Sequence, residues 1–296
     1  MSSARPVGID AGPHTADDGV FGPDSVTWRV MAHPATGLGA GAAAMIQMLY
    51  PPVMYVVDQA SSVRENPARR AQRTSDYATT ITYGDTATAE KAGETLRRIH
   101  ARCTAIDPDT GAQIVADEPH LLVWVHNALT WALLRTYALF GVEMTQAECD
   151  QFVFEQQAGA RLVGCAPGSV ATSQAELEAY MVSMEPRLAF SAPCVWFKEL
   201  MSEKPEKGGI AAAATKALMI QAMVAIMSDH HRALYGYPWG PLRERMVLGA
   251  TRAALSKMIE KLPADKAIGQ LREYVDTHAF GARRTRTVEP LEAPVN

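Results

Sequence analysis

The sequence predicts an all-α protein built as a single multi-helix globular domain. Stretches with helical periodicity alternate with Pro and Gly along the whole chain. No run of alternating apolar and polar residues bounded by hairpin turns is evident. Of the 296 residues, 48% are hydrophobic and 20% are charged, which is close to the average of soluble globular proteins.

Composition and charge argue against several classes of protein. The formal net charge of -4 provides no broad positive field for a phosphate backbone, so we expect no nucleic-acid partner. The four cysteines include no CxxC pair, which is typical of free thiols in a reducing compartment. The N-terminal residues lack the apolar stretch of a signal peptide. We therefore expect a cytoplasmic protein.

Two apolar segments have the length of membrane spans. Residues 38–57 contain Pro51 and Pro52, and residues 209–227 contain Lys216, which would be costly in hydrocarbon. We expect both segments to be buried helices of a soluble core, with no integral membrane segment.

Pro and Gly mark the ends of the first expected helices. Residues 36–50 are rich in Ala and Met and stop at a Pro-Pro pair, after which a second helix covers about 53–61. The third, 67–83, has Pro67 at its start and Gly84 after its end.

Two longer helices follow. Residues 87–103 are rich in helix formers, and the sequence 107–111 after them is typical of a turn. Pro119 then starts an apolar helix that ends near Phe140, before Gly141.

Capping signals indicate the later helices. Thr145 with Glu148, and Ser173 with Glu176, are capping-box pairs for helices over 145–161 and 173–185. Further helices are expected over residues 191–203, 210–235, 241–261 and 264–277. The single domain should cover 21–281, between flexible segments over 1–20 and 282–296 that lack periodicity.

Three consecutive expected helices each carry a polar group among apolar neighbours. These groups are Arg70, Arg73, Thr74 and Tyr77 on the first helix, His100 on the second, and Trp124, His126 and Thr130 on the third. A histidine with several cations in an apolar helical environment suits a heme, because neutral imidazole binds iron and Arg neutralises propionates. Spacing alone leaves this open, since a histidine on an apolar helix face is more often a hydrogen-bonded core residue.

Six blocks in one order carry a family resemblance: FGPDSVTWRV, LGAGAAAMIQMLYPPV, RRAQRT before YGD, LRRIHARC, DEPHLLVWVHNAL and EQQAGARLVG. Over about residues 21–250 the chain resembles the MpaB-type oxygenase and rubber oxygenase catalytic domain family. The resemblance implies an all-α fold like that of latex clearing protein, with a heme pocket between helices. That relative holds a b-type heme and cleaves polyisoprene with dioxygen.

The resemblance also implies roles for single residues. His100, in HARC, matches the proximal iron ligand, and Arg70 and Thr74 match an Arg and a Thr near the heme. The relative's distal Lys falls on Arg73, which cannot deprotonate to ligate iron, so the distal position should be open or water-filled. His126 is then a candidate for the distal side of the heme or for the layer of residues around it. The segment after His100 departs from the family pattern.

Together these features predict a heme b-dependent oxygenase or oxidase. His100 is the expected metal ligand, with Arg70, Arg73, Thr74 and Trp124 around the cofactor and with Arg73, Thr74 and His126 as catalytic candidates. Expected partners are a small apolar organic substrate and dioxygen or peroxide, and a homodimer is one of the oligomeric states left open. The alternatives are a heme carrier or sensor, and a non-heme metal enzyme using both histidines.

Other polar residues have simpler explanations. Neighbouring residues on a helix point about 100° apart, so His230 and His231 cannot chelate one ion together. Cys103, one turn from His100, is expected to be a packing residue. Glu155 and Arg161 could form a buried ion pair or contact the heme, and the sequence does not decide between these.

Overall fold

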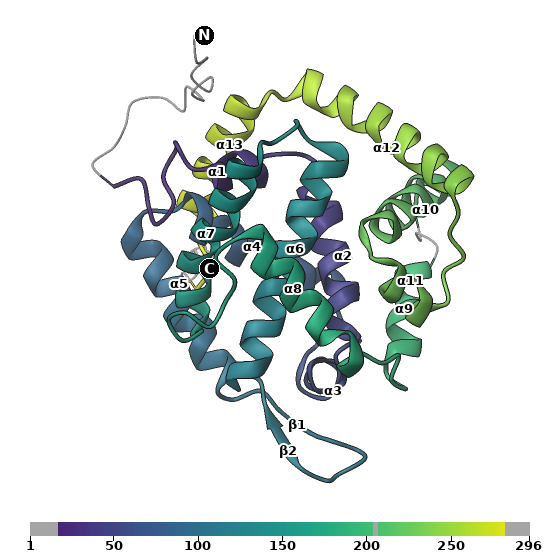
Figure 1. The fold of residues 1–296 in the computed structure, drawn as a ribbon. Coiled ribbons are helices and arrows are strands. Elements are labelled where there is room, and N and C mark those ends of the chain that lie inside the picture. Colours follow the sequence, from purple (N-terminus) through teal and green to yellow (C-terminus); the bar gives the residue numbers. More distant parts are fainter. Residues whose placement is uncertain (1–16, 204–206, 282–296) are drawn as a thin grey trace, which may run out of the picture.

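The computed structural model describes residues 17–203 and 207–281, which form an all-α fold with one short hairpin (Figure 1). The first helices are α1 (Val26–Met31), α2 (Thr36–Met48), α3 (Pro51–Ala60), α4 (Pro67–Tyr83), α5 (Thr86–His100), α6 (Pro119–Phe140) and α7 (Gln146–Val163). After them come α8 (Gln174–Met184), a 3-10 turn (Glu185–Arg187), α9 (Cys194–Ser202), α10 (Gly209–Ile226), α11 (Asp229–Tyr235), α12 (Pro241–Lys261) and α13 (Ala264–His278). The predicted fold class is confirmed, whereas residues 1–16 and 282–296 of the predicted terminal segments lie outside the described residues.

Helices α2 and α6 lie side by side at the centre of the fold (Figure 1). A Cβ added at Gly39 would lie 2.8 Å from the Thr136 Oγ1, so glycine permits the close approach of the two helices. Gln47 Nε2 donates a hydrogen bond to the Val125 carbonyl at 2.8 Å, and Trp124 Nε1 donates one to the Gln47 carbonyl at 3.2 Å. The buried side chains of α2 and α6 lie in the main hydrophobic core.

Helices α4, α5 and α7 lie on one side of the central pair, and α9, α10 and α11 lie on the other (Figure 1). Helix α5 packs against both α4 and α7. A Cβ at Gly93 of α5 would lie 2.8 Å from the Leu162 carbonyl oxygen of α7, so this contact also depends on glycine. The helices that carry the predicted site residues therefore form one packed group, α4 to α7.

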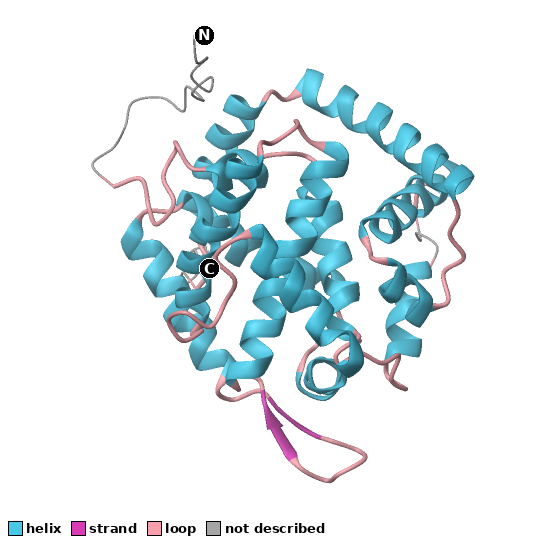
Figure 2. Ribbon diagram, viewed as in Figure 1, coloured by secondary structure: helices cyan, strands magenta, loops and turns pink. Residues whose placement is uncertain are grey.

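Two short strands, β1 (Thr104–Ile106) and β2 (Gln113–Val115), pair antiparallel and protrude from the helical body (Figure 2). They were not predicted, because three residues are too few to show an alternating pattern. The main chain of Ile106 donates to Gln59 Oε1 at 2.8 Å and accepts from Gln59 Nε2 at 2.9 Å, which fixes the hairpin to α3. The predicted helix 87–103 therefore stops at His100, and the predicted turn 107–111 is the hairpin loop.

The predicted helix 210–235 is in fact two helices, α10 and α11. Ser228 starts α11, because its side chain accepts a hydrogen bond from the main chain of His231. Helix α1 was not predicted either. It has only six residues and begins at Ser25, whose side chain accepts from the Trp28 main chain.

Helix α10 is less buried than the sequence led us to expect. Only its last residues, 222–226, are buried, and Ile210 near its start is 92% exposed. By length and composition α10 could cross a membrane, and 28% of its apolar window is buried. Helices α2 and α3 pass the same test together, although they are bent by 104°. The expectation of a buried core helix is thus wrong for the first part of α10, whereas α2 is largely buried.

The start of α7 is fixed by the predicted capping box. The Thr145 side chain accepts from the Glu148 main chain, and the Glu148 carboxylate accepts from the Thr145 main chain at 2.8 Å. Arg29 of α1 donates to the same carboxylate at 2.7 Å. The Thr145 main-chain bond and the Arg29 guanidinium lower the pKa of Glu148 to about 2.

We expect Glu148→Gln to make the stability of the protein less sensitive to acid. The folded-state pKa of Glu148 lies below the unfolded value of about 4.3, so the unfolded state binds more protons between these values. The contribution of Glu148 is therefore present above about pH 4.3 and is lost as the pH falls toward 2. Urea midpoints at several pH values between 2.5 and 6 should show a smaller slope for the variant than for the wild type. An equal slope in both proteins, or the same change in the exposed control Glu143→Gln, would contradict this assignment.

Candidate functional site

His100 is the last residue of α5 and is partly buried. Its Nδ1 is enclosed and has no hydrogen-bond partner in the part of the chain that the structure describes. Burial and the nearby positive charge of Arg70 lower the pKa of His100, and Asp117 opposes this shift. The imidazole is therefore neutral at neutral pH, which is the form that binds a metal.

The face of α4 opposite His100 is cationic. Arg70 donates a hydrogen bond to the Thr74 hydroxyl, which in turn donates to the Arg70 carbonyl at 3.1 Å. Burial and the positive charge of Arg73 lower the pKa of Arg70. Within the described residues neither arginine forms an ion pair with a carboxylate. Their charge is available for an anionic ligand such as a carboxylate pair.

Tyr77 lies one turn further along α4, and its hydroxyl is enclosed without a hydrogen-bond partner among the described residues. Its ring meets the Phe280 ring edge-on, with centroids 5.3 Å apart. Burial raises the pKa of Tyr77, so the phenol keeps its proton and can donate a hydrogen bond. Sequence reasoning placed Tyr77 on the same face as Arg70 and Thr74 but gave it no role.

His126 on α6 faces α7. Its Nε2 is enclosed without a partner in the described part of the chain, and a hydrogen bond joins the imidazole to the main chain of Gln156. Burial lowers the pKa of His126 to about 4. The Cε1 of this ring is the atom nearest to a Cβ built at Gly159, at 3.6 Å.

Sequence reasoning missed the contribution of α7. Neither Gln156 nor Gly159 was named as a site residue, although a glycine between two alanines in the middle of a helix is a recognisable signal. The Gln156 contact comes from its main chain, so the residue type at this position could not predict it. The structure thus adds Tyr77, Gln156 and Gly159 to the predicted residues.

Trp124 lies in the main core rather than beside the two histidines. Its side chain is fully buried, its Nε1 bonds to α2 through Gln47, and its ring meets the Tyr50 ring at a centroid distance of 6.0 Å. These contacts give Trp124 a packing role between α2 and α6. Its predicted contact with a cofactor stays a prediction.

Helices α4, α5 and α6 each present one enclosed polar atom without a partner in the described chain: Tyr77 Oη, His100 Nδ1 and His126 Nε2. Each such atom destabilises a fold by about 1–3 kcal/mol unless another group satisfies it. Arg70 and Arg73 are exposed and have no carboxylate partner among the described residues. Together these groups fit an anionic cofactor that would be bound through a neutral imidazole.

Glu155 and Arg161 do not pair with each other. Glu155 accepts hydrogen bonds from the Val26 and Thr27 main chains and so caps the start of α1. Arg161 pairs with Glu90 of α5 at 2.6 Å. Both side chains connect α7 to neighbouring helices.

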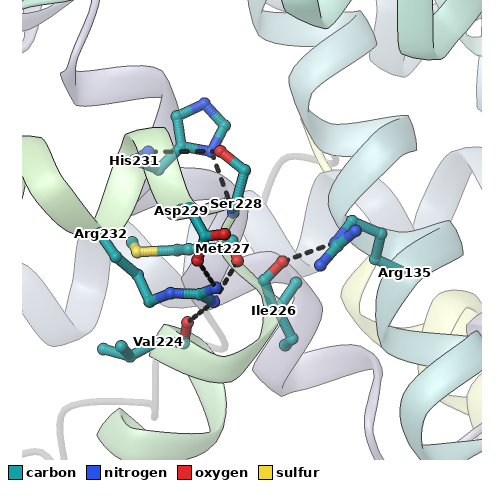
Figure 3. A network of polar contacts seen from close by, with 8 residues as sticks. All are labelled: Arg135, Val224, Ile226, Met227, Ser228, Asp229, His231 and Arg232. Carbon is teal, nitrogen blue, oxygen red and sulfur yellow. Dashed lines mark hydrogen bonds and ion pairs between the residues drawn. The ribbon is translucent and has the colours of Figure 1, made fainter. Parts of the chain in front are cut away.

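His230 and His231 do not form a metal pair with Asp229. Figure 3 shows Asp229 directed to Arg232 and the His231 ring directed to Ser228, whose Oγ lies 3.0 Å from Nδ1. The His231 ring also packs edge-on against Trp131 of α6. No group of three or more metal-ligating side chains occurs within residues 17–203 and 207–281.

A surface cavity of about 660 Å³ lies between the end of α6, the loop that follows and α12. Its lining includes His33, Cys149 and Arg252, and none of the predicted site residues. Most of its other lining side chains are apolar, among them Leu139, Leu255 and Ile259.

These features define an all-α protein with two neutral histidines, two arginines without carboxylate partners among the described residues, and a phenol with an enclosed hydroxyl. A family model described as "ER-bound oxygenase mpaB/B'/Rubber oxygenase, catalytic domain" matches residues 28–256, so the chain belongs to this family. The matched region contains every predicted site residue and places the chain among oxygenase catalytic domains. Comparisons with curated proteins and with solved structures gave no match.

Proposed function

We propose that this chain is a heme b-dependent oxygenase that acts on a small apolar organic substrate with dioxygen or peroxide. The family match supports the oxygenase class. The observation that carries the heme assignment is His100, a neutral imidazole near Arg70. Arg70 lies near Arg73, and both lack carboxylate partners in the described chain. A dianionic cofactor with an iron centre can use both features, the imidazole as an iron ligand and the guanidinium groups as partners of its carboxylates.

In this proposal His100 holds the iron, and Arg70 and Arg73 face the propionates. A guanidinium such as that of Arg73 does not ligate iron, so a bound heme would remain open to a small ligand. The hydrogen bonds between Arg70 and Thr74 hold both side chains in one orientation. Bound heme would supply the activation of dioxygen or peroxide, while the chain supplies position and an apolar surrounding.

The substrate side of the site would be formed by His126 together with apolar groups. Ile81 Cδ1 and Phe21 Cζ each lie 3.9 Å from a Cβ built at Gly159, so both line the space beside the His126 ring. Trp124 would contribute indirectly, because its hydrogen bond to Gln47 holds α6 against α2. We further propose that the protein works in the cytoplasm, where its four free cysteines stay reduced.

Hemin titration of the purified chain tests this function. We expect binding of one hemin per chain, a Soret band, and a five-coordinate ferrous form that reacts with dioxygen. A spectrally silent protein would overturn the proposal. A spectrum of six-coordinate heme that does not react with added ligands would instead indicate a heme carrier or sensor. Iron without a pyridine hemochrome signal would indicate a non-heme enzyme.

A further inference from the structure

The His126 ring is held in one protonation state by α7. The hydrogen bond between the imidazole and the Gln156 main chain raises the pKa of His126, as a bond donated by a ring N–H to the Gln156 carbonyl oxygen does. Since Nε2 has no partner in the described chain, the donating atom is Nδ1. The Gln156 side chain is itself bound to Thr27 at 2.8 Å, which fixes this residue between α7 and α1.

This tautomer turns Nε2 into an acceptor. A neutral imidazole with its proton on Nδ1 carries a lone pair on Nε2 and has no hydrogen to donate there. Because burial lowers the pKa of His126 to about 4, the ring stays in this state at neutral pH. An enclosed acceptor without a donor costs about 1–3 kcal/mol, so a bound molecule with an O–H or N–H group would be favoured at this position.

Gly159 leaves space beside the same ring. A glycine inside a helix is less favourable than alanine by about 0.5–1 kcal/mol. The nearest atoms to a Cβ built at Gly159 lie at 3.6 to 3.9 Å, which is ordinary contact, so protein packing does not require glycine here. Gly93 differs, because its Cβ would lie 2.8 Å from a main-chain oxygen. A ligand beside His126 would explain why position 159 has no side chain.

We propose that the substrate of this site is an apolar molecule that carries one hydroxyl or N–H group, and that this group donates a hydrogen bond to His126 Nε2 beside Gly159. This inference rests on the proposed function and adds to it the substrate class. His126 acts as a positioning acceptor and forms no covalent bond.

The first test reads the tautomer directly. Proton–nitrogen NMR of the histidine side chains in the full chain, before and after hemin loading, should show His126 protonated on Nδ1 only, from pH 6 to 8. A proton on Nε2, or an imidazolium, would overturn the inference. The measurement before loading does not depend on heme, so a failure of the heme proposal would be recognised separately.

The second test uses two probes of similar shape, 2-naphthol and 2-methoxynaphthalene. We expect 2-naphthol to bind about tenfold more tightly and to shift the His126 Nε2 signal, because only its hydroxyl can donate. His126→Leu should remove this preference. Equal binding of the two probes, or an unchanged Nε2 signal with both, would overturn the inference. If hemin without either probe removes the signal of the unligated Nε2, His126 is an iron ligand and the inference is overturned.

Gly159→Ala provides an independent check of the space beside the ring. The variant should fold with an unchanged or raised Tm, because alanine favours the helix, yet bind 2-naphthol about tenfold more weakly. Gly249→Ala is the matched control, since Gly249 lies within α12 with no atom within 4 Å of its built Cβ. It should gain the same helical preference and keep probe binding. Unchanged binding in Gly159→Ala would mean that no ligand uses this space.

Discussion

His100→Ala is expected to abolish heme retention, or to shift the Soret band to that of an unligated heme, whereas His126→Ala should retain heme and change its reactivity. His100 ends α5 beside Arg70, where the charge of a dianionic cofactor would be neutralised. His126 has no arginine among the groups that shift its pKa, and its Cε1 lies 3.6 Å from a Cβ built at Gly159. The two histidines therefore have different electrostatic surroundings although both are neutral.

Absorption spectra and the heme content of the purified variants measure this difference. His120→Ala is a suitable control, because His120 is an exposed histidine at the start of α6. It should behave as the wild type. If His126→Ala loses heme and His100→Ala retains it, the ligand roles are reversed and the assignment by family resemblance is wrong. Melting temperatures of the heme-free variants would show whether either change acts by unfolding the chain.

Local sequence signals predicted those parts of the fold that depend on local chemistry. The helix over 67–83 was predicted with the bounds that α4 has, because Pro67 and Gly84 mark its ends. The capping box of Thr145 and Glu148 placed the start of α7. The break at Ser228 was missed, because the apolar pattern of α10 concealed the capping signal of α11.

The candidate site was predictable only in part, for a physical reason. Helical periodicity places Arg70, Thr74 and Tyr77 on one face, and the structure agrees. It cannot reveal which helix lies opposite, so the contacts of the His126 ring with the Gln156 main chain and with Gly159 emerged only from the packing of α6 on α7.

Helical periodicity also cannot show whether Trp124 packs in the core or contacts a cofactor. A stability measurement can separate these two roles. Trp124→Ala should lower the free energy of unfolding by about 3–5 kcal/mol, because a fully buried indole leaves a cavity between α2 and α6. Trp124→Phe retains most of the volume but loses the bond to the Gln47 carbonyl, so a smaller loss of about 1–3 kcal/mol is expected. Urea unfolding of the heme-free protein, followed by circular dichroism, measures both losses.

The expected losses follow from packing alone, so they must appear without any cofactor. Trp239→Ala is the matched control: Trp239 is only partly buried, and its Nε1 has no partner within the described residues, so its loss should be smaller. A marginally stable domain could unfold altogether when Trp124 becomes Ala, and Trp124→Phe then remains the decisive variant. Unchanged heme-free stability of Trp124→Phe together with weakened hemin binding would mean that the indole contacts the cofactor and that its packing between α2 and α6 is secondary.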